Sequence, residues 1–185
     1  LYSSSENLMM TVVSFDSNYA FSRGGALAFS SRAVFHLQEV TMLNNQASYG
    51  GGIYCSDDGE LIMRNSSIVS NVARLSGGGL YVNSSNYFEM HDNMVRNNSA
   101  ISGNGGGAYL AAYSNYIRNG SHNASFSNVN FVENQAENGS GGGIYRFGDV
   151  HLNVFNSIFS TNRASQGGGL SLVNGTSNFA NVSIL

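Results

Sequence analysis

Gly77-Gly78-Gly79-Leu80-Tyr81 is one of six copies of a glycine-rich motif that recur along this 185-residue chain. The third residue of each copy follows that of the preceding copy by 26, 27, 28, 36 and 26 residues, so one interval carries an insertion. Repeats of roughly 20–50 residues are typical of solenoids and similar arrays. The copies begin at Gly24, Gly50, Gly77, Gly105, Gly141 and Gly167.

A second element lies upstream of each glycine motif. It consists of a large apolar residue, two variable residues, an Asn, and an Ala shortly afterwards. Before it lie short apolar runs that alternate with polar residues, such as Phe35 and Leu37. Alternation with a period of two indicates β-strands rather than helices. The six sets are Phe15/Asn18/Ala20, Met42/Asn45/Ala47, Ile68/Asn71/Ala73, Met94/Asn97/Ala100, Phe131/Asn134/Ala136 and Phe159/Asn162/Ala164.

These repeats predict an all-β fold, a right-handed parallel β-helix that forms one domain over residues 1–185. A unit of about 27 residues with three short strands cannot bury its apolar residues alone, but stacked units bury them against each other. We expect six to seven such coils and one long loop inserted near residues 113–125. Helical periodicity and leucine-rich spacing are both missing from the sequence, which disfavours the other solenoids of similar repeat length.

Stacking turns each repeated position into a column along the axis. The predicted asparagine ladder is structural, because an amide both donates and accepts hydrogen bonds and Asn tolerates the left-handed turn conformation. A tyrosine column follows the glycines at Tyr54, Tyr81, Tyr109 and Tyr145. Two interpretations of it remain open: an exposed aromatic stripe for sugars or a partner, and, favoured, stacked rings half-buried on the coil. The predicted ladder is Asn18, Asn45, Asn71, Asn97, Asn134 and Asn162.

The two elements together resemble the repeats of the polymorphic outer-membrane proteins, the chlamydial adhesins, and similar repeats in large secreted β-helix proteins of protists and algae. Phe15-Asp16-Ser17-Asn18 with Gly24-Gly25-Ala26-Leu27 fits that pattern directly, and the resemblance spans essentially the whole chain. It implies a β-helix that is secreted or displayed at a cell surface, and it implies adhesion as one function.

Eight Asn-x-Ser/Thr sequons are candidate sites of N-glycosylation in a secreted protein. Asn97 is a poor acceptor if it belongs to the buried ladder. Asn83, Asn119, Asn123 and Asn174 are the first choices, because the insertion and the turns are expected to be accessible. The remaining candidates are Asn65, Asn138 and Asn181. N-linked glycans would also protect the surface of a chain in which only 10% of all residues are charged.

No catalytic, cofactor or metal site is predicted. The one acidic pair, Asp57-Asp58, is followed by Glu60 in an expected turn, and the four histidines share no metal-ligand spacing. The glycine motifs lack the Lys-Ser/Thr of a phosphate-binding loop. The lone Cys55 is interpreted as a small buried hydrophobe. Eight scattered Lys and Arg and a net charge of −3 argue against nucleic-acid binding, and no apolar run is long enough to span a membrane.

The leading functional prediction is therefore a non-enzymatic, extracellular structural protein, a glycosylated β-helical rod or fibre segment. Because the repeats run from the first residue to the last, we expect further coils, of the same chain or of a second copy, to stack end to end on it. The alternatives are a cell-surface adhesin or glycan-binding module and, less favoured, a polysaccharide lyase or hydrolase.

Overall fold

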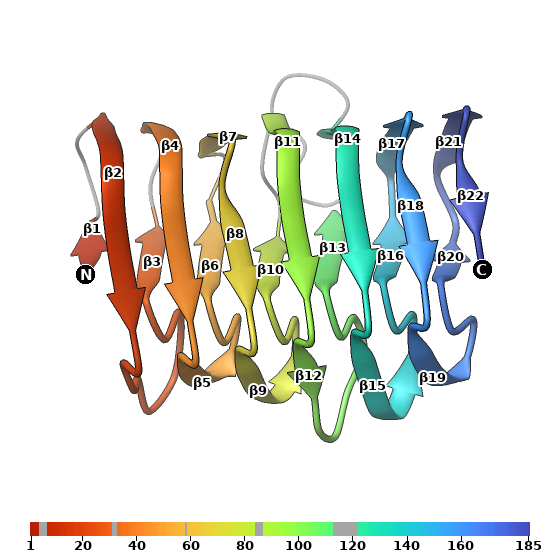
Figure 1. Ribbon diagram of the computed structural model, residues 1–185, viewed down its shortest axis with the longest axis horizontal. Helices are drawn as coiled ribbons and strands as arrows, with labels where there is room; N and C mark the ends of the chain where they lie inside the picture. Colours follow the sequence, from red (N-terminus) through yellow and green to blue (C-terminus); the bar gives the residue numbers. More distant parts are fainter. Residues whose placement is uncertain (4–6, 31–32, 58, 84–86, 113–121) are drawn as a thin grey trace.

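The chain forms a solenoid of short parallel strands. The computed structural model describes residues 1–3, 7–30, 33–57, 59–83, 87–112 and 122–185, and within these residues it contains strands and turns but no helix. A helix long and apolar enough to cross a lipid bilayer is therefore not found in the described part. Successive coils are paired with each other along the whole solenoid (Figure 1), so the predicted all-β parallel β-helix is confirmed.

Three parallel sheets make up the walls of the solenoid. Sheet A contains, in order, β1 (Tyr2–Ser3), β3 (Leu27–Ser30), β6 (Ile53–Ser56), β10 (Leu80–Asn83), β13 (Ala108–Ala112), β16 (Ile144–Gly148) and β20 (Leu170–Val173). Sheet B contains β2 (Leu8–Asp16), β4 (Val34–Leu43), β7 (Glu60–Arg64), β8 (Ser67–Val69), β11 (Tyr87–Arg96), β14 (His122–Val132), β17 (Val150–Phe155), β18 (Ile158–Ser160), β21 (Thr176–Ala180) and β22 (Ser183–Ile184). Sheet C contains β5 (Gln46–Tyr49), β9 (Val72–Ser76), β12 (Ser99–Ala100), β15 (Gln135–Ser140) and β19 (Arg163–Gln166).

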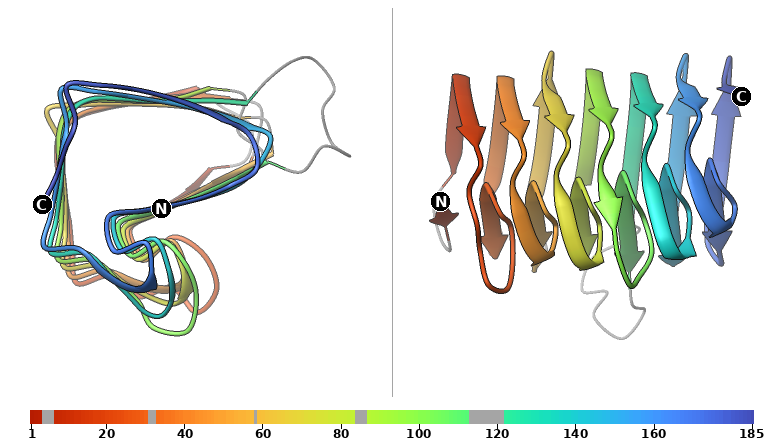
Figure 2. Two further views of the ribbon diagram at one scale, coloured as in Figure 1. Left: turned by 90° about the vertical axis from the view of Figure 1, so that its right-hand side faces the viewer. Right: turned by 60° about the horizontal axis from the view of Figure 1, so that its bottom comes forward.

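Left-handed backbone conformations make the corners of each coil (Figure 2). One column of positive-φ residues bends the long strands of sheet B, and a second one joins sheet B to sheet C. Asn tolerates this conformation better than other non-glycine residues, which explains its frequency at these corners. The first column is Val12, Glu39, Asn65, Asp92, Asn128, Asn156 and Asn181, and the second is Ser17, Asn44, Ser70, Asn97, Glu133 and Thr161.

The glycine motif makes the turn from sheet C to sheet A. Its first residue has positive φ, as at Gly50 (φ 63°), where glycine has no steric penalty. Its second residue lies against the next coil, because a Cβ built on Gly51 would be 2.3 Å from the carbonyl oxygen of Gly78. Glycine is therefore required at both positions, for two different physical reasons.

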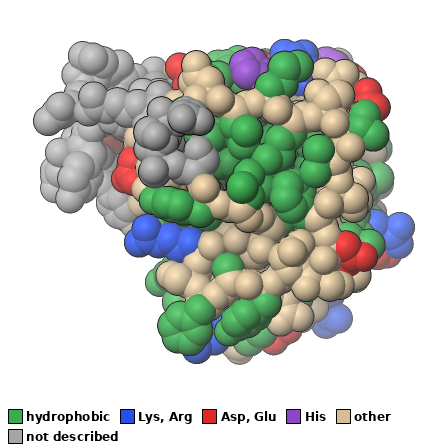
Figure 3. All heavy atoms as spheres, turned by 90° about the vertical axis from the view of Figure 1, so that its left-hand side faces the viewer, with side chains coloured by type: hydrophobic (Ala, Val, Ile, Leu, Met, Phe, Trp, Pro, Cys, Tyr) green, Lys and Arg blue, Asp and Glu red, His purple; other side chains and the backbone are tan. Residues whose placement is uncertain are grey.

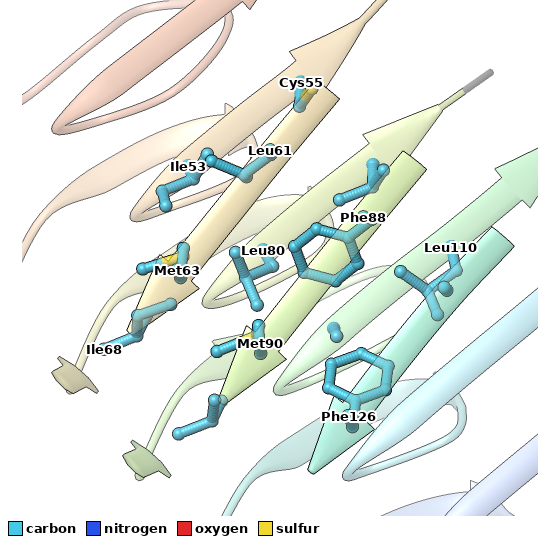
Figure 4. Packing of buried hydrophobic residues seen from close by; sticks show 14 of the residues in the cluster. Ile53, Cys55, Leu61, Met63, Ile68, Leu80, Phe88, Met90, Leu110 and Phe126 are labelled. Atoms are coloured by element: carbon cyan, nitrogen blue, oxygen red, sulfur yellow. The ribbon is translucent and has the colours of Figure 1, made fainter. Parts of the chain in front are cut away.

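The core fills the space between the three sheets. Inward residues alternate with outward ones along each strand, as in β11, and the inward ones from successive coils pack in columns. Figure 4 shows Leu61, Phe88, Met90 and Phe126 packed in this interior. Cys55 is fully buried in the same cluster, in agreement with its interpretation as a packing residue.

The long insertion is shorter than the sequence predicted. Residues 113–121 lie outside the described part, and residues 122–125 belong to strand β14. Strand β14 pairs with β11 and β17 from its first residues onward, because the backbone of Asn123 is in register with those of Tyr87 and His151. The placement of Asn123 in a loop was therefore wrong.

Apolar side chains gather at the end of the solenoid that carries β1 and β2. Figure 3 faces this end and shows hydrophobic side chains over its centre. Leu8, Met10, Val13 and Phe15 of β2 are only partly buried there, although their equivalents in later coils form the closed core.

Candidate functional site

The asparagine ladder runs through six successive coils, with one correction to the predicted set. The side-chain amide of Asn71 donates through Nδ2 to Oδ1 of Asn98 at 3.0 Å, and Asn98 donates in the same way to Asn134 at 3.0 Å. Each Oδ1 also accepts the backbone N–H of the preceding ladder residue, as Asn98 does from Asn71 at 2.9 Å. The ladder is Asn18, Asn45, Asn71, Asn98, Asn134 and Asn162.

Asn97 is not in the ladder, and its prediction there was wrong. It occupies the corner column at φ 54°, is exposed, and donates through Nδ2 to the hydroxyl of Ser70 at 3.0 Å. The frame of this repeat shifts by one residue, because Val95 rather than Met94 pairs with Ile68 and Phe131 in the inward column. With Val95 and Asn98 as the members, the fourth repeat has the same spacing as the other five.

The tyrosine column is a continuous stack on the outer face of sheet A. The ring centroids of Tyr54 and Tyr81 are 5.2 Å apart, those of Tyr81 and Tyr109 are 4.6 Å apart, and those of Tyr109 and Tyr145 are 5.3 Å apart. Tyr54 and Tyr109 are buried, and the guanidinium of Arg23 lies 4.9 Å from the centroid of the Tyr54 ring. The stacking agrees with the favoured interpretation, although Tyr54 and Tyr109 are buried rather than half-buried as predicted.

Charged and phenolic groups from neighbouring coils meet on the outer face of sheet B. Tyr87 donates its hydroxyl to Glu89 Oε2 at 2.5 Å, and Arg64 Nη2 donates to Glu89 Oε1 at 2.8 Å. The hydrogen bond to Glu89, followed by burial, raises the pKa of Tyr87 above its ordinary value. Glu60 lies in strand β7 in register with Tyr87, rather than in the expected turn. The Tyr87 hydroxyl is thus held as a neutral donor.

A buried cation interrupts the inward column of sheet A. Arg146 is only 3% exposed and stands between Leu110 and Leu172 in register. Its Nη1 donates to the carbonyl oxygens of Val150 (3.0 Å) and Thr176 (2.8 Å), and burial lowers its pKa. No sequence signal distinguished this residue, because it occupies an ordinary column position. Its hydrogen bonds connect strand β16 to the first residues of strands β17 and β21.

A groove crosses the outer face of sheet C. It has a volume of about 230 Å³ and extends over residues from four successive coils. Tyr19 and Phe21 on one side are 72% and 79% exposed. The repeat motif gave no hint of it, because its lining residues differ from coil to coil. They are Tyr19, Phe21, Gln46, Ala47, Ser48, Val72, Arg74 and Ile101, which we name the sheet C groove.

Most of the sequon asparagines face outward. Asn65, Asn97 and Asn181 are exposed in the corner columns, and Asn174 is exposed at φ 62° between β20 and β21. Asn138 is exposed in strand β15, where its Nδ2 donates to the carbonyl of Ile101 at 2.9 Å. Asn83 and Asn123 are half-buried on strands β10 and β14, and Asn119 lies outside the described residues. The structure thus adds Asn97 to the accessible set.

The remaining candidate groups lie apart from one another. Asp57 accepts hydrogen bonds from the hydroxyls of Ser30 (2.5 Å) and Ser56 (3.1 Å), and Asp58 lies outside the described residues. His91 pairs with Asp92, whereas His122 is buried in strand β14. Across the residues that can be described, no three His, Cys, Asp or Glu side chains gather as a set of metal ligands.

Comparison with known proteins relates the chain to one broad family. The family described as right handed beta helix region matches residues 25–184. Neither the curated proteins nor the solved structures contain a match to the chain. The match covers most of the repeat region, and the narrower resemblance to chlamydial adhesin repeats stays a prediction.

Proposed function

The chain belongs to the right-handed β-helix family, and from that premise we propose that it is a non-enzymatic, extracellular or cell-surface structural protein, an N-glycosylated rod or segment of a fibre. One observation carries the proposal. The asparagine ladder connects six successive coils through side-chain amides, fully buried from Asn45 to Asn134, in addition to the backbone pairing of three sheets.

Coils that are connected both by backbone pairing and by side-chain amides are suited to a load-bearing role. Bending or separating two coils would break buried amide hydrogen bonds, and an unpaired buried polar group costs about 1–3 kcal/mol. The tyrosine stack and the stacked pair Phe131 and Phe159 add ring contacts in the same direction, with centroids 4.9 Å apart in that pair. A rod built in this way resists deformation along its whole length.

The outward corners suit glycan attachment. Asn65, Asn97 and Asn181 project from left-handed corners rather than from the packed sheets, so a glycan there would leave the coil pairing undisturbed. Glycans at these positions would shield the exposed apolar residues of a weakly charged surface, which supports an extracellular location.

Further β-helix coils are the partners that the rod proposal requires. The end faces are apolar: Met10 and Val13 are partly buried at one end, and Leu170 and Val182 at the other. A coil of the same repeat, contributed by this chain or a second copy, would cover such a face with its own apolar columns and pair with its strands.

The test is the state of association of the 185-residue protein secreted from eukaryotic cells. Negative-stain electron microscopy and sedimentation velocity should show elongated particles that lengthen with concentration, and glycopeptide analysis should find occupied sequons. Met10→Lys places a charge on the end face and should abolish lengthening. Met9→Lys is the matched control, because Met9 is exposed on the outer side of the same strand. Compact monomers at all concentrations would contradict the proposal.

Adhesion is the second candidate function, and exposed aromatic residues favour it. The covered tyrosine column offers little free ring surface, but Tyr19 and Phe21 are largely exposed beside the sheet C groove. A surface with flat rings and polar side chains is suited to binding a saccharide or a cell-surface partner. A polysaccharide lyase or hydrolase is the least favoured candidate, and the group formed by Glu60, Tyr87 and Glu89 is where its chemistry would be sought.

A further inference from the structure

Two tyrosine rings from neighbouring coils meet at a steep angle beside the tyrosine column. Tyr49, the last residue of β5, and Tyr81 of β10 have ring centroids 5.2 Å apart and ring planes inclined by 66°. Both faces of the Tyr81 ring are covered, one by Tyr54 from the preceding coil and the other by Tyr109 from the following coil. Tyr49 therefore contacts the edge of the Tyr81 ring, whereas the contacts within the column are face to face.

Both rings of this contact are accessible from solvent. Tyr49 and Tyr81 are half-buried, whereas Tyr54 is buried. The backbone of Tyr49 is held by the preceding coil, because its N–H donates to the carbonyl oxygen of Ser22 at 3.0 Å and its carbonyl accepts the N–H of Gly24 at 3.0 Å. A small reagent can therefore reach both rings, and only side-chain torsions have to change for the rings to come closer.

The composition limits the covalent cross-links that this chain can form. The 185 residues include one Cys and no Lys, but ten Tyr. A disulfide within these residues and a cross-link through a lysine amine are therefore impossible. Two phenols in contact, by contrast, can couple when each loses one electron and one proton. Tyrosine is thus the residue type through which two coils of this chain can be joined covalently.

We propose that Tyr49 and Tyr81 are a site of oxidative cross-linking, where a dityrosine bond staples one coil to the next. A haem peroxidase uses hydrogen peroxide to remove one electron and one proton from each phenol. The two radicals bond through ring carbons next to their hydroxyls, and the hydrogens on these carbons move to the oxygens. The peroxide is reduced to two waters. The source of the oxidant rests on the proposed extracellular location, because secreted proteins meet oxidising conditions.

Ring geometry selects this pair over the stacked tyrosines. Rings joined by a dityrosine bond meet at their edges and are twisted, because the hydroxyls beside the bond would collide in a common plane. The contact between Tyr49 and Tyr81 has this form. Tyr54 lies at the same centroid distance from Tyr81, 5.2 Å, but its ring is inclined by only 9°. Coupling there would break the stack and push apart two strands that are paired in register.

The sequence provides this edge contact in one repeat. Tyr49 directly precedes the glycine motif, and none of the other five repeats has tyrosine at that position. We therefore expect a single staple, between the coils that contain β6 and β10, rather than one staple for each coil. The corresponding residues of the other repeats are Arg23, Ser76, Asn104, Ser140 and Gln166.

Peptide mapping after oxidation of the dilute 185-residue protein with a haem peroxidase and hydrogen peroxide tests the proposal. Once N-linked glycans are removed, trypsin cuts after arginine and separates Tyr49 from Tyr81, in residues 33–64 and 75–96. We expect these two peptides to be joined in the monomer, with a combined mass lower by two hydrogen atoms. Tyr49→Phe should abolish the joined product. Tyr54→Phe is the matched control and should retain it, because Tyr54 is in the same peptide and at the same distance from Tyr81.

The opposite response of the two variants would assign the coupling to the stack and overturn the proposal. Joined peptides that occur only in dimers, or no joined peptides at all, would also refute it. The cross-linked monomer should unfold at a temperature roughly 5–15 °C higher, because a covalent link restricts the unfolded chain as a disulfide does. An unchanged midpoint would contradict the role as a staple. End-to-end association does not affect these results, because the oxidant is supplied and the product is a monomer.

Discussion

At the scale of single residues, chemical identity matters less than the position of the residue in the coil. Asn97 and Asn98 are neighbours of the same type, yet one is an exposed corner residue and the other is fully buried with its amide hydrogen-bonded on both sides. A buried amide that serves two neighbours cannot be removed without leaving their polar groups unpaired. The same side chain in a corner mainly relieves backbone strain.

The pair offers a matched test. Asn98→Ala leaves the Nδ2 of Asn71 and the carbonyl of Ile68 without their partner, so we expect a loss of about 3 kcal/mol or more in unfolding free energy. Asn97→Gly should change it by less than about 0.5 kcal/mol, because glycine adopts positive φ freely. Urea denaturation monitored by circular dichroism measures both. Equal effects would mean that the side-chain ladder adds nothing to the backbone pairing.

Val12 is the least suitable residue in its corner column. It has φ 54°, where a β-branched side chain is strained, and it is exposed. Most other members of the column are Asn or Asp, which tolerate this conformation. Val12→Asn should therefore raise the unfolding free energy by about 1 kcal/mol. Val69→Asn, on an outward position of strand β8, is the control and should not stabilise; a gain there of the same size would point to a general effect of Asn.

At the scale of strands and turns, the sequence predicted the features that recur from coil to coil and missed those that occur in only one place. The glycine motif and the Phe-x-x-Asn element identified the turns, the inward columns and the ladder, because stacking imposes the same environment on equivalent residues. The fourth repeat was misaligned because Met94-Val95 and Asn97-Asn98 each offer two equally plausible frames, and only pairing with Ile68 and Phe131 selects one. Arg146 and the sheet C groove were missed because they depend on residues that differ between coils.

The contact between Tyr87 and Glu89 on the outer face of sheet B predicts how the pKa of Tyr87 responds to substitution. Glu89→Gln removes the carboxylate that holds the Tyr87 proton, so the pKa of Tyr87 should fall toward its ordinary value. Each protein is titrated with and without the additional substitution Tyr87→Phe, and the difference in absorbance between the two titrations isolates the Tyr87 phenol. Glu60→Gln is the control and should produce a smaller decrease, because Glu60 acts only through charge.

The same pKa shift determines how the stability contributed by the Tyr87–Glu89 hydrogen bond depends on pH. The folded pKa of Tyr87 lies above the unfolded value, so the stabilisation is present below the ordinary tyrosine pKa of about 10 and is lost as the pH rises through the folded pKa. An unchanged Tyr87 titration in Glu89→Gln would show that burial rather than the hydrogen bond controls the proton.

At the scale of the whole molecule, each coil depends only on its two neighbours. The three sheets, the corner columns and the ladder all repeat with the coil, so no single coil holds a unique structural position in the described chain. Solenoids of this kind are stabilised by repeat and interface contributions that are approximately additive. The number of coils is then a variable that protein engineering can change.

Deletion of residues 53–79, one full coil, should leave a folded protein. Gly52 is then followed by Leu80, which restores the motif, and Asn45 meets Asn98 directly in the ladder. We expect a cooperative unfolding transition, an unchanged β circular-dichroism spectrum and a rod about 4.8 Å shorter by small-angle scattering. Deletion of residues 53–65 removes about half a coil and should prevent folding. If both deletions behave alike, coil register does not control the fold.

The ladder also gives the rod a direction. From Asn18 to Asn162, each side-chain amide donates to the amide oxygen of the following coil, and no bond of the ladder runs the other way. Aligned amide dipoles add, as they do along a helix, so the column is electrically asymmetric: its negative pole lies toward β2 and its positive pole toward β22. An array of such rods in parallel would be a polar material, with two chemically different ends and a preferred orientation in an electric field.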